Sequence, residues 1–176
     1  MMNKHVCYIH GLGSDAQSKK YQQLKSALPA TLTVECLQWE NHDNISTLLE
    51  HTATRLQQYS YVVLIGDSTG GNFAYQLRDL LQPHVSKTTL ILLNPLLDLD
   101  RRIATFAFPD NLATYLKQIT HPKNTYIFIS QNDEIIDHQW LLQQSLPTIT
   151  CYTYHDTHRF IDFQNCLPRI QSIIAK

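Results

Sequence analysis

The alternation of short apolar runs with amphipathic segments constrains the fold of this chain more than any other feature. The apolar runs predict strands, and each is followed by apolar residues at helical spacing. The expected strands are 6–9, 32–37, 61–65, 88–93, 125–129 and 149–154; the expected helices are 21–28, 45–56, 73–81 (ended by Pro83), 112–119, 140–146 and 163–174. Apolar strands separated by helices are typical of a parallel sheet covered on both faces. We therefore expect an α/β protein built as a three-layer αβα sandwich.

The composition predicts one globular domain over residues 1–176. Apolar residues make up 43% of the chain and charged residues 16%, a balance that allows a sizeable core. The formal net charge of −1 predicts no surface for nucleic acid or anionic lipid, and no apolar run is long enough for a membrane span. The first apolar run is too short for a signal peptide, and the cysteines are far apart. These features favour a cytoplasmic protein that binds neither nucleic acid nor membranes.

The stretch LIGDSTGGNF, residues 64–73, places a serine between a predicted strand and a predicted helix. This is the setting of a nucleophile elbow, a sharp turn that exposes a serine hydroxyl. Gly66 and Gly70 would face each other across Ser68, where a β-carbon would collide. The first backbone N–H groups of the following helix would surround the hydroxyl with donors for an anion. A phosphate-binding loop is the competing interpretation, but its lysine and glycine patterns are absent.

The few glycines are concentrated in two loops. All five lie either in the loop after the first strand, at Gly11 and Gly13, or around Ser68. A serine nucleophile needs an oxyanion hole, and these two loops are where its donors are expected. We predict that the backbone N–H groups of Leu12 and Thr69 form it.

An acid and a base are expected after the late strands. Asp133 follows the fifth strand and is favoured as the acid; Asp98 and Asp137 are alternatives, and Asp137 would otherwise cap a helix. His158 follows the last strand and is favoured as the base over His155. The order serine, aspartate, histidine is the chain order of α/β-hydrolases.

Two further features complete the expectations. His155 and His158 form a His-x-x-His pair, but no third and fourth ligand accompanies them, so we predict no metal. Residues 98–123 form the longest connection, with Phe106 and Phe108 in it. A long, partly apolar connection at this end of a sheet is either a small lid or pocket wall or an ordinary crossover helix.

These motifs resemble the α/β-hydrolase superfamily, and within it the small bacterial esterases of the YqiA/YcfP type. The resemblance covers nearly the whole chain and rests on YIHGLGSDAQSKK, GDSTGGNFA, QNDEIID and HDTHRF. It implies about six parallel strands in the order 2-1-3-4-5-6 and no cofactor. It also implies an esterase or thioesterase that acts through Ser68, His158 and Asp133. The small size of the chain and its minimal lid favour small soluble acyl esters as substrates. The alternative is an inactive member of the fold that serves as a binding module.

The chain departs from the family pattern at two positions. The oxyanion loop has Leu12 where an aromatic residue is usual, and the histidine loop lacks the glycines that often precede the base. The second departure keeps His155 open as the base.

Overall fold

A single parallel sheet organises the protein. The computed structural model describes residues 3–82, 84–144 and 146–176. The strands are β1 (Lys4–Ile9), β2 (Thr33–Leu37), β3 (Tyr61–Asp67), β4 (Lys87–Leu93), β5 (Thr125–Asn132) and β6 (Ile149–Thr157). They lie in the order β2-β1-β3-β4-β5-β6, and all neighbouring pairs are parallel. The predicted fold class and strand order are therefore confirmed.

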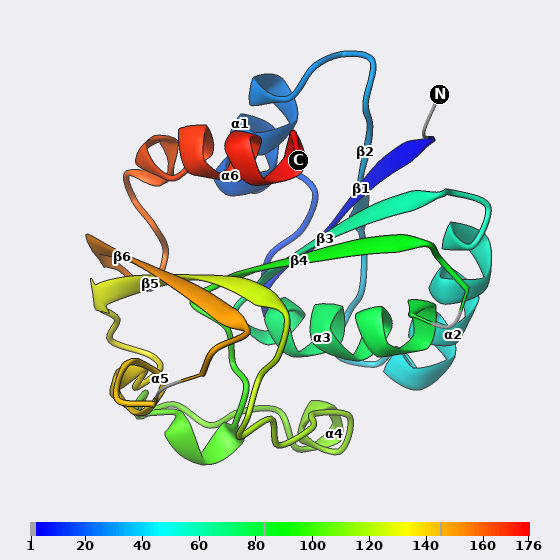
Figure 1. Ribbon diagram of the computed structural model, residues 1–176. Helices are drawn as coiled ribbons and strands as arrows, with labels where there is room; N and C mark the ends of the chain where they lie inside the picture. Colours follow the sequence, from blue (N-terminus) through cyan, green and yellow to red (C-terminus); the bar gives the residue numbers. More distant parts are fainter. Residues whose placement is uncertain (1–2, 83, 145) are drawn as a thin grey trace.

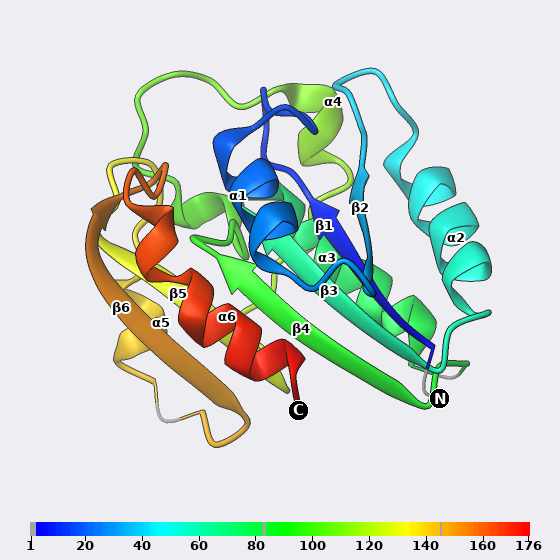
Figure 2. The same cartoon turned by 90° about the horizontal axis from the view of Figure 1, so that it is seen from above.

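Helices cover both faces of the sheet. Figure 1 shows α1 (Lys19–Ala27) and α6 (Leu167–Ile174) above it, and α2 (Ile45–Leu56) and α3 (Thr69–Leu81) below it. Figure 2 looks down on the layer of α1 and α6, with the strands running from β6 at one edge to β2 at the other. This is the expected three-layer arrangement. Among the described residues, every helix is too short or too polar to cross the apolar part of a membrane.

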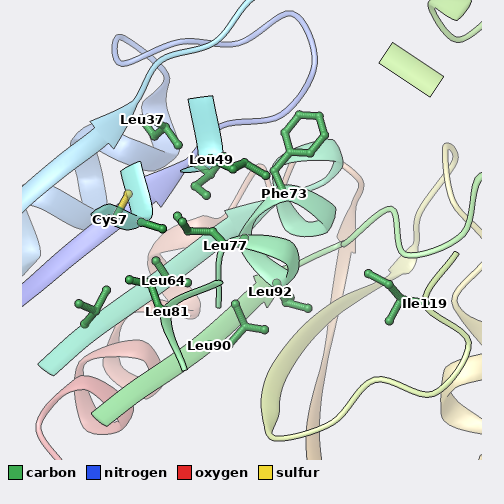
Figure 3. Close-up of a cluster of buried hydrophobic side chains, with 14 of the residues drawn as sticks. Cys7, Leu37, Leu49, Leu64, Phe73, Leu77, Leu81, Leu90, Leu92 and Ile119 are labelled. Atoms are coloured by element: carbon green, nitrogen blue, oxygen red, sulfur yellow. The ribbon is translucent and has the colours of Figure 1, made fainter. Parts of the chain in front are cut away.

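The central strands are apolar because the helices bury both of their faces. Every residue of β3 is buried. Successive side chains of a strand point to opposite faces, so Val62 and Leu64 join the core under α2 and α3, whereas Val63 and Ile65 join the core under α1 and α6. Figure 3 shows the first of these cores, where Leu77 of α3 lies beside Leu64. Burial of each such side chain contributes about 1.5–3 kcal/mol.

Polar side chains define where the first two long helices begin. Ser18 accepts a hydrogen bond from the N–H of Tyr21 and caps α1, and Asn44 accepts one from the N–H of Thr47 and caps α2. Such caps satisfy helix N–H groups that have no partner within the helix. α3 begins differently, since its first residue directly follows Ser68 and no side chain caps it.

The prediction of a helix over 112–119 is wrong. Only α4 (Asp110–Ala113) is helical there, and the rest of the segment is irregular. Side chains of α3 bind its backbone instead, because Asn72 donates to the carbonyl of Lys117 and Gln76 donates to the carbonyl of Tyr115. These tertiary hydrogen bonds occupy carbonyl groups that a helix would use.

Other boundaries differ by smaller amounts. The helix expected over 140–146 is the short α5 (Gln139–Leu142), and the one expected over 163–174 begins with a 3₁₀ turn (Phe163–Asn165) before α6. A second 3₁₀ turn (Leu99–Arg101) follows β4. β6 continues to Thr157, three residues beyond its expected end. The predicted stop at Pro83 lies outside the described residues.

Candidate active site

Ser68 sits at a strained turn between β3 and α3. Its φ of 53° and ψ of −117° are unusual for a residue with a side chain, and such backbone costs on the order of 1–3 kcal/mol. The surrounding structure holds the turn, since the Ser68 carbonyl accepts hydrogen bonds from the N–H groups of Gly71 and Leu96, both at 2.9 Å. A turn of this shape projects the serine hydroxyl at the carboxyl edge of the sheet.

Glycines make the turn sterically possible. A β-carbon on Gly66 would stand 2.5 Å from the carbonyl oxygen of Gly70, and one on Gly70 would collide with the backbone carbonyls of Ile9 and His10. Only glycine therefore lets α3 start so close to β1 and β3. The remaining glycine of the turn has a different neighbour, because a β-carbon on Gly71 would meet Pro95.

Ser68, His158 and Asp133 lie within hydrogen-bond distance in series. His158 Nε2 is 2.9 Å from Ser68 Oγ. His158 Nδ1 is 2.9 Å from Asp133 Oδ1 and 2.8 Å from Oδ2. A carboxylate only accepts hydrogen bonds, so Nδ1 is the nitrogen that donates to Asp133, and Nε2 of a neutral imidazole can then accept the hydroxyl proton of Ser68. The three residues come from loops after β5 and β6 and from the turn after β3.

The surroundings of Asp133 favour its charged form. Its side chain is 3% exposed, and burial by itself raises the pKa of the carboxyl. Hydrogen bonding and charge interaction with His158, together with hydrogen bonds from the N–H groups of Ile135 and Ile136, outweigh burial and lower the pKa below its ordinary value. The Asp133 carboxylate can therefore orient the imidazole and stabilise its protonated state.

A second buried histidine lies against the same carboxylate. His138 Nδ1 is 3.4 Å from Asp133 Oδ2, and His138 Nε2 is 3.2 Å from the carbonyl oxygen of Pro95. Burial lowers the pKa of His138, even though the nearby carboxylate opposes this shift. His138 and His158 thus both place Nδ1 near the same carboxylate oxygen, Oδ2 of Asp133.

Two polar side chains that sequence reasoning did not single out hold the His158 loop. Glu134 accepts the backbone N–H of His158 at 3.0 Å, and Asn94 donates to the backbone carbonyl of His158 at 2.9 Å. Asn94 is fully buried and has a φ of 40°. Its position directly after a buried strand and before a proline is a signal that could have identified it.

The loop after β1 passes directly over Ser68. An added β-carbon on Gly11 would lie 3.2 Å from Ser68 Cβ, and Gly13 has a φ of 70° that glycine adopts without strain. Among the hydrogen bonds of the described residues, none uses the backbone N–H of Leu12 as donor. Thr69 is the first residue of α3, and the N–H of a first helical residue has no partner within its helix.

The alternative acids and base lie elsewhere. Asp98 accepts the N–H of Asp100 and Asp137 accepts the N–H of Gln139, so both cap short turns. His155 is an exposed residue within β6, because that strand runs past it. In the part of the chain that the structure describes, none of the three contacts the Ser68 hydroxyl. Nor do three or more His, Cys, Asp or Glu side chains gather there as a metal ion would require.

A buried ion pair lies beside the serine. Lys20 Nζ is 2.6 Å from the carboxylate of Asp67, whose side chain is 5% exposed, and the Tyr8 hydroxyl donates to the same carboxylate at 3.2 Å. Lys20 thus neutralises the acid that precedes Ser68. Sequence reasoning missed this pair, because no local spacing links residues in α1 and at the end of β3.

Ser68 and His158 open into a cavity of about 680 Å³. The loop after β1 lines one part of it. Arg102, Phe106 and Phe108 line another part and come from the long connection between β4 and β5, which runs below the sheet in Figure 1. A cavity of this volume lies within the usual range for small-molecule sites.

The sheet order, the helix layers and the serine turn define the α/β-hydrolase fold. Residues 5–175 match the family described as "Uncharacterised protein family (UPF0227)", and the chain belongs to this family. The resemblance to α/β-hydrolases of the YqiA/YcfP type is thereby confirmed. No curated protein sequence matches the chain significantly.

Solved structures share the fold at low sequence identity. One of the metagenome-derived lipolytic enzymes LipS and LipT has a TM-score of 0.73 and 13% identity, with 99% of this chain and 94% of that one covered. An alpha/beta superfamily hydrolase from Oenococcus oeni has a TM-score of 0.71 and 12% identity, with 98% and 93% covered. The RedJ thioesterase of the prodiginine pathway in Streptomyces coelicolor has a TM-score of 0.68 and 13% identity, with 97% and 85% covered.

Proposed function

We propose that this protein is a serine hydrolase, an esterase or thioesterase that acts on small soluble acyl substrates. The observation that carries the proposal is the hydrogen-bonded series from Ser68 Oγ through His158 to Asp133, with the serine on a strained turn. A hydroxyl next to a neutral imidazole, itself oriented by a carboxylate, is the arrangement that activates a serine nucleophile.

In the first half of the reaction, Ser68 Oγ forms a bond to the carbonyl carbon of the substrate, and its proton moves to His158 Nε2. The carbonyl oxygen becomes an oxyanion. When the tetrahedral intermediate collapses, the bond to the leaving alcohol or thiol breaks and that group takes the proton from Nε2. An acyl group remains on Ser68. The ionised Asp133 stabilises the imidazolium throughout.

In the second half, water replaces the alcohol or thiol. A water molecule gives its proton to His158 Nε2 as its oxygen attacks the acyl carbon. Collapse of the second intermediate returns the proton to Ser68 Oγ and releases the carboxylic acid. No redox step or co-reactant other than water is needed.

The oxyanion is assigned to the backbone N–H groups of Leu12 and Thr69. Leu12 lies on the glycine-containing loop over Ser68, and Thr69 opens α3, whose dipole favours negative charge at this end. Each such donor is commonly worth about 3 kcal/mol in the transition state.

The connection 98–123 is assigned to the wall of the acyl site. Three of its residues line the cavity, and Asn72 and Gln76 of α3 fasten its second half. The similarity in fold to lipolytic enzymes and to a thioesterase supports ester or thioester substrates.

Labelling with a fluorophosphonate tests the proposal directly. We expect intact-protein mass to increase by one probe adduct per chain for the wild-type protein, and no adduct for Ser68→Ala. Circular dichroism of both proteins checks that they are folded. Absence of an adduct on folded wild-type protein would favour a binding module on the same fold. Ligands would then be sought by thermal shift.

A further inference from the structure

The cavity beside Ser68 is positively charged, although the whole chain is not. The formal net charge of the protein is −1. The charged side chains that line the cavity, apart from His158, are four cations and two carboxylates: Lys19, Lys20, Arg102, Arg159, Asp67 and Glu134. Charge of one sign in a concave, partly apolar site attracts ligands of the opposite sign. The excess of cations is therefore a local property of the site.

Both carboxylates in the cavity already have partners. Asp67 is bound by Lys20 and by the Tyr8 hydroxyl. Glu134 accepts the backbone N–H of His158. Neither is within ion-pair distance of Arg102. Neither carboxylate of the cavity therefore neutralises the positive charge of Arg102, and an anionic ligand could do so.

Arg102 has hydrogen-bonding capacity that the described residues do not use. Its Nη1 donates to the carbonyl oxygen of Phe106 at 2.8 Å. Its Nη2 is shielded from solvent and has no acceptor among the described residues. An unpaired donor on a charged group is costly, so this guanidinium gains from any acceptor that can reach it.

The arginine is also held in position. Its guanidinium carbon lies 4.5 Å from the centre of the Phe106 ring and 5.7 Å from that of Phe108. Its backbone forms a β-bridge with Ile136, which lies in the same loop as Asp133. A cation that is oriented before binding loses little entropy when it meets a ligand.

We propose that Arg102 binds an anionic group of the substrate, a carboxylate or a phosphate, and so makes this protein selective for negatively charged esters or thioesters. The planar guanidinium suits both groups, since two N–H donors can bind two oxygens at once. This inference rests on the proposed function, because it names the substrate class of the same site.

The neighbouring arginine provides a matched control. Arg101 is 46% exposed at its side chain, lies 4.0 Å from Asp98, and does not line the cavity. Removing its charge changes the net charge of the protein as much as removing that of Arg102. Comparison of the two variants therefore separates a specific role of Arg102 from a general effect of net charge.

The test compares para-nitrophenyl hexanoate with esters of the same length that end in a carboxylate (the adipic acid monoester) or in a phosphonate. For the wild-type protein we expect kcat/KM to be higher for at least one anionic ester, by about ten- to a hundredfold, the range for a charge-assisted hydrogen bond. The anion that gains more identifies the preferred group. In Arg102→Gln this preference should fall to near unity, while Arg101→Gln should keep it.

The proposal is overturned if the wild-type protein prefers the neutral ester, or if Arg102→Gln keeps the anionic preference. If Arg102→Gln does not fold, Arg102→Lys is used instead. Its ratio of kcat/KM for the anionic ester to kcat/KM for the neutral ester should lie between the wild-type ratio and one. Salt adds a test on wild-type protein, because kcat/KM for the anionic ester alone should decrease with added sodium chloride.

Failure of the proposed function gives a different pattern. In that case no ester is cleaved and Ser68 is not labelled by the fluorophosphonate. The inference is then judged by calorimetry with the monoamide of adipic acid. Binding to wild type and to Arg101→Gln but not to Arg102→Gln supports an anion site, and equal binding or none overturns it.

Discussion

Gly66 and Gly70 face each other across the turn that carries Ser68, so that a β-carbon on Gly66 would stand 2.5 Å from the carbonyl oxygen of Gly70. The closest atoms belong to the backbone, and the remaining neighbour of Gly66, the Cβ of Ala74, is attached directly to it, so no flexible side chain can move aside to make room. The geometry of the serine turn therefore depends on the absence of two β-carbons.

The first prediction concerns the stability of this turn. Gly66→Ala and Gly70→Ala should each lower the free energy of unfolding by about 3 kcal/mol or more, since overpacking against backbone forces the helix away from the sheet. Gly13→Ala is the control, because it makes the same chemical change at a position where nothing lies within 4 Å of the added carbon. Gly13 has a φ of 70°, so only backbone strain opposes this substitution. Its cost should be about 1–2 kcal/mol. Urea titrations measure all three, and equal losses would contradict the steric argument.

The second prediction concerns the acid. Asp133→Asn should reduce kcat by about 10⁴-fold with little change in fold, because the amide no longer holds the His158 proton on Nδ1. Asp137→Asn changes a nearby aspartate that only caps a turn, and it should leave kcat within a few fold of wild type. Ester hydrolysis measured for both variants decides the assignment. More than a tenth of wild-type activity in Asp133→Asn would remove Asp133 from the proposed mechanism.

The third prediction concerns the attachment of the cavity wall. Asn72 is fully buried and donates from its amide to the carbonyls of Leu96 and Lys117 at 2.9 and 2.8 Å. Asn72→Ala should cost about 2–4 kcal/mol of unfolding free energy, because it leaves the buried carbonyl of Leu96 and the partly buried carbonyl of Lys117 without this donor. Trypsin should also cleave within 98–123 faster than in wild type.

The control for this experiment is Asn41→Ala. Asn41 is exposed, and its side chain takes part in none of the hydrogen bonds of the described residues. Its cleavage rate should match that of wild type. If Asn72→Ala is cleaved no faster than Asn41→Ala, the wall is held by its apolar contacts rather than by Asn72.

The fourth prediction concerns pH. Glu35 in β2 forms two hydrogen bonds with Arg55 of α2, at 2.9 and 2.7 Å, and lies 3.1 Å from His5. Burial alone raises the pKa of Glu35, but His5 and Arg55 outweigh it and lower the pKa from 4.5 to about 2. A carboxyl whose pKa is lower in the folded state stabilises the fold above its unfolded pKa. That contribution is lost as the pH falls from 4.5 to about 2.

Unfolding free energies from pH 7 to pH 2 test this dependence. Glu35→Gln should be less stable than wild type at pH 7, and the difference should shrink as the pH falls from 4.5 to about 2. Glu40→Gln changes a glutamate that is 77% exposed, and its stability should follow that of wild type at every pH. A constant difference between Glu35→Gln and wild type would show that packing, not ionisation, is responsible.

The sequence alone determined the local parts of this protein. The alternation of apolar runs and helical spacing predicted the sheet and its layers, because those patterns reflect which faces must be buried. The glycines around Ser68 predicted a sharp turn, because backbone conformation and close approach depend on the residue itself. The serine, an aspartate and a histidine that the structure brings together were each selected from their place after a strand.

Tertiary structure decided everything that depends on partners distant in the chain. β6 continues to Thr157, and this extension leaves His155 on an exposed strand position while it brings His158 to Ser68. Side chains of α3 bind the backbone of the expected helix over 112–119 and keep most of it irregular. Arg101 and Arg102 are adjacent in sequence, yet only Arg102 lines the cavity. Local spacing carries no information on such contacts, because they form only when separate elements pack together.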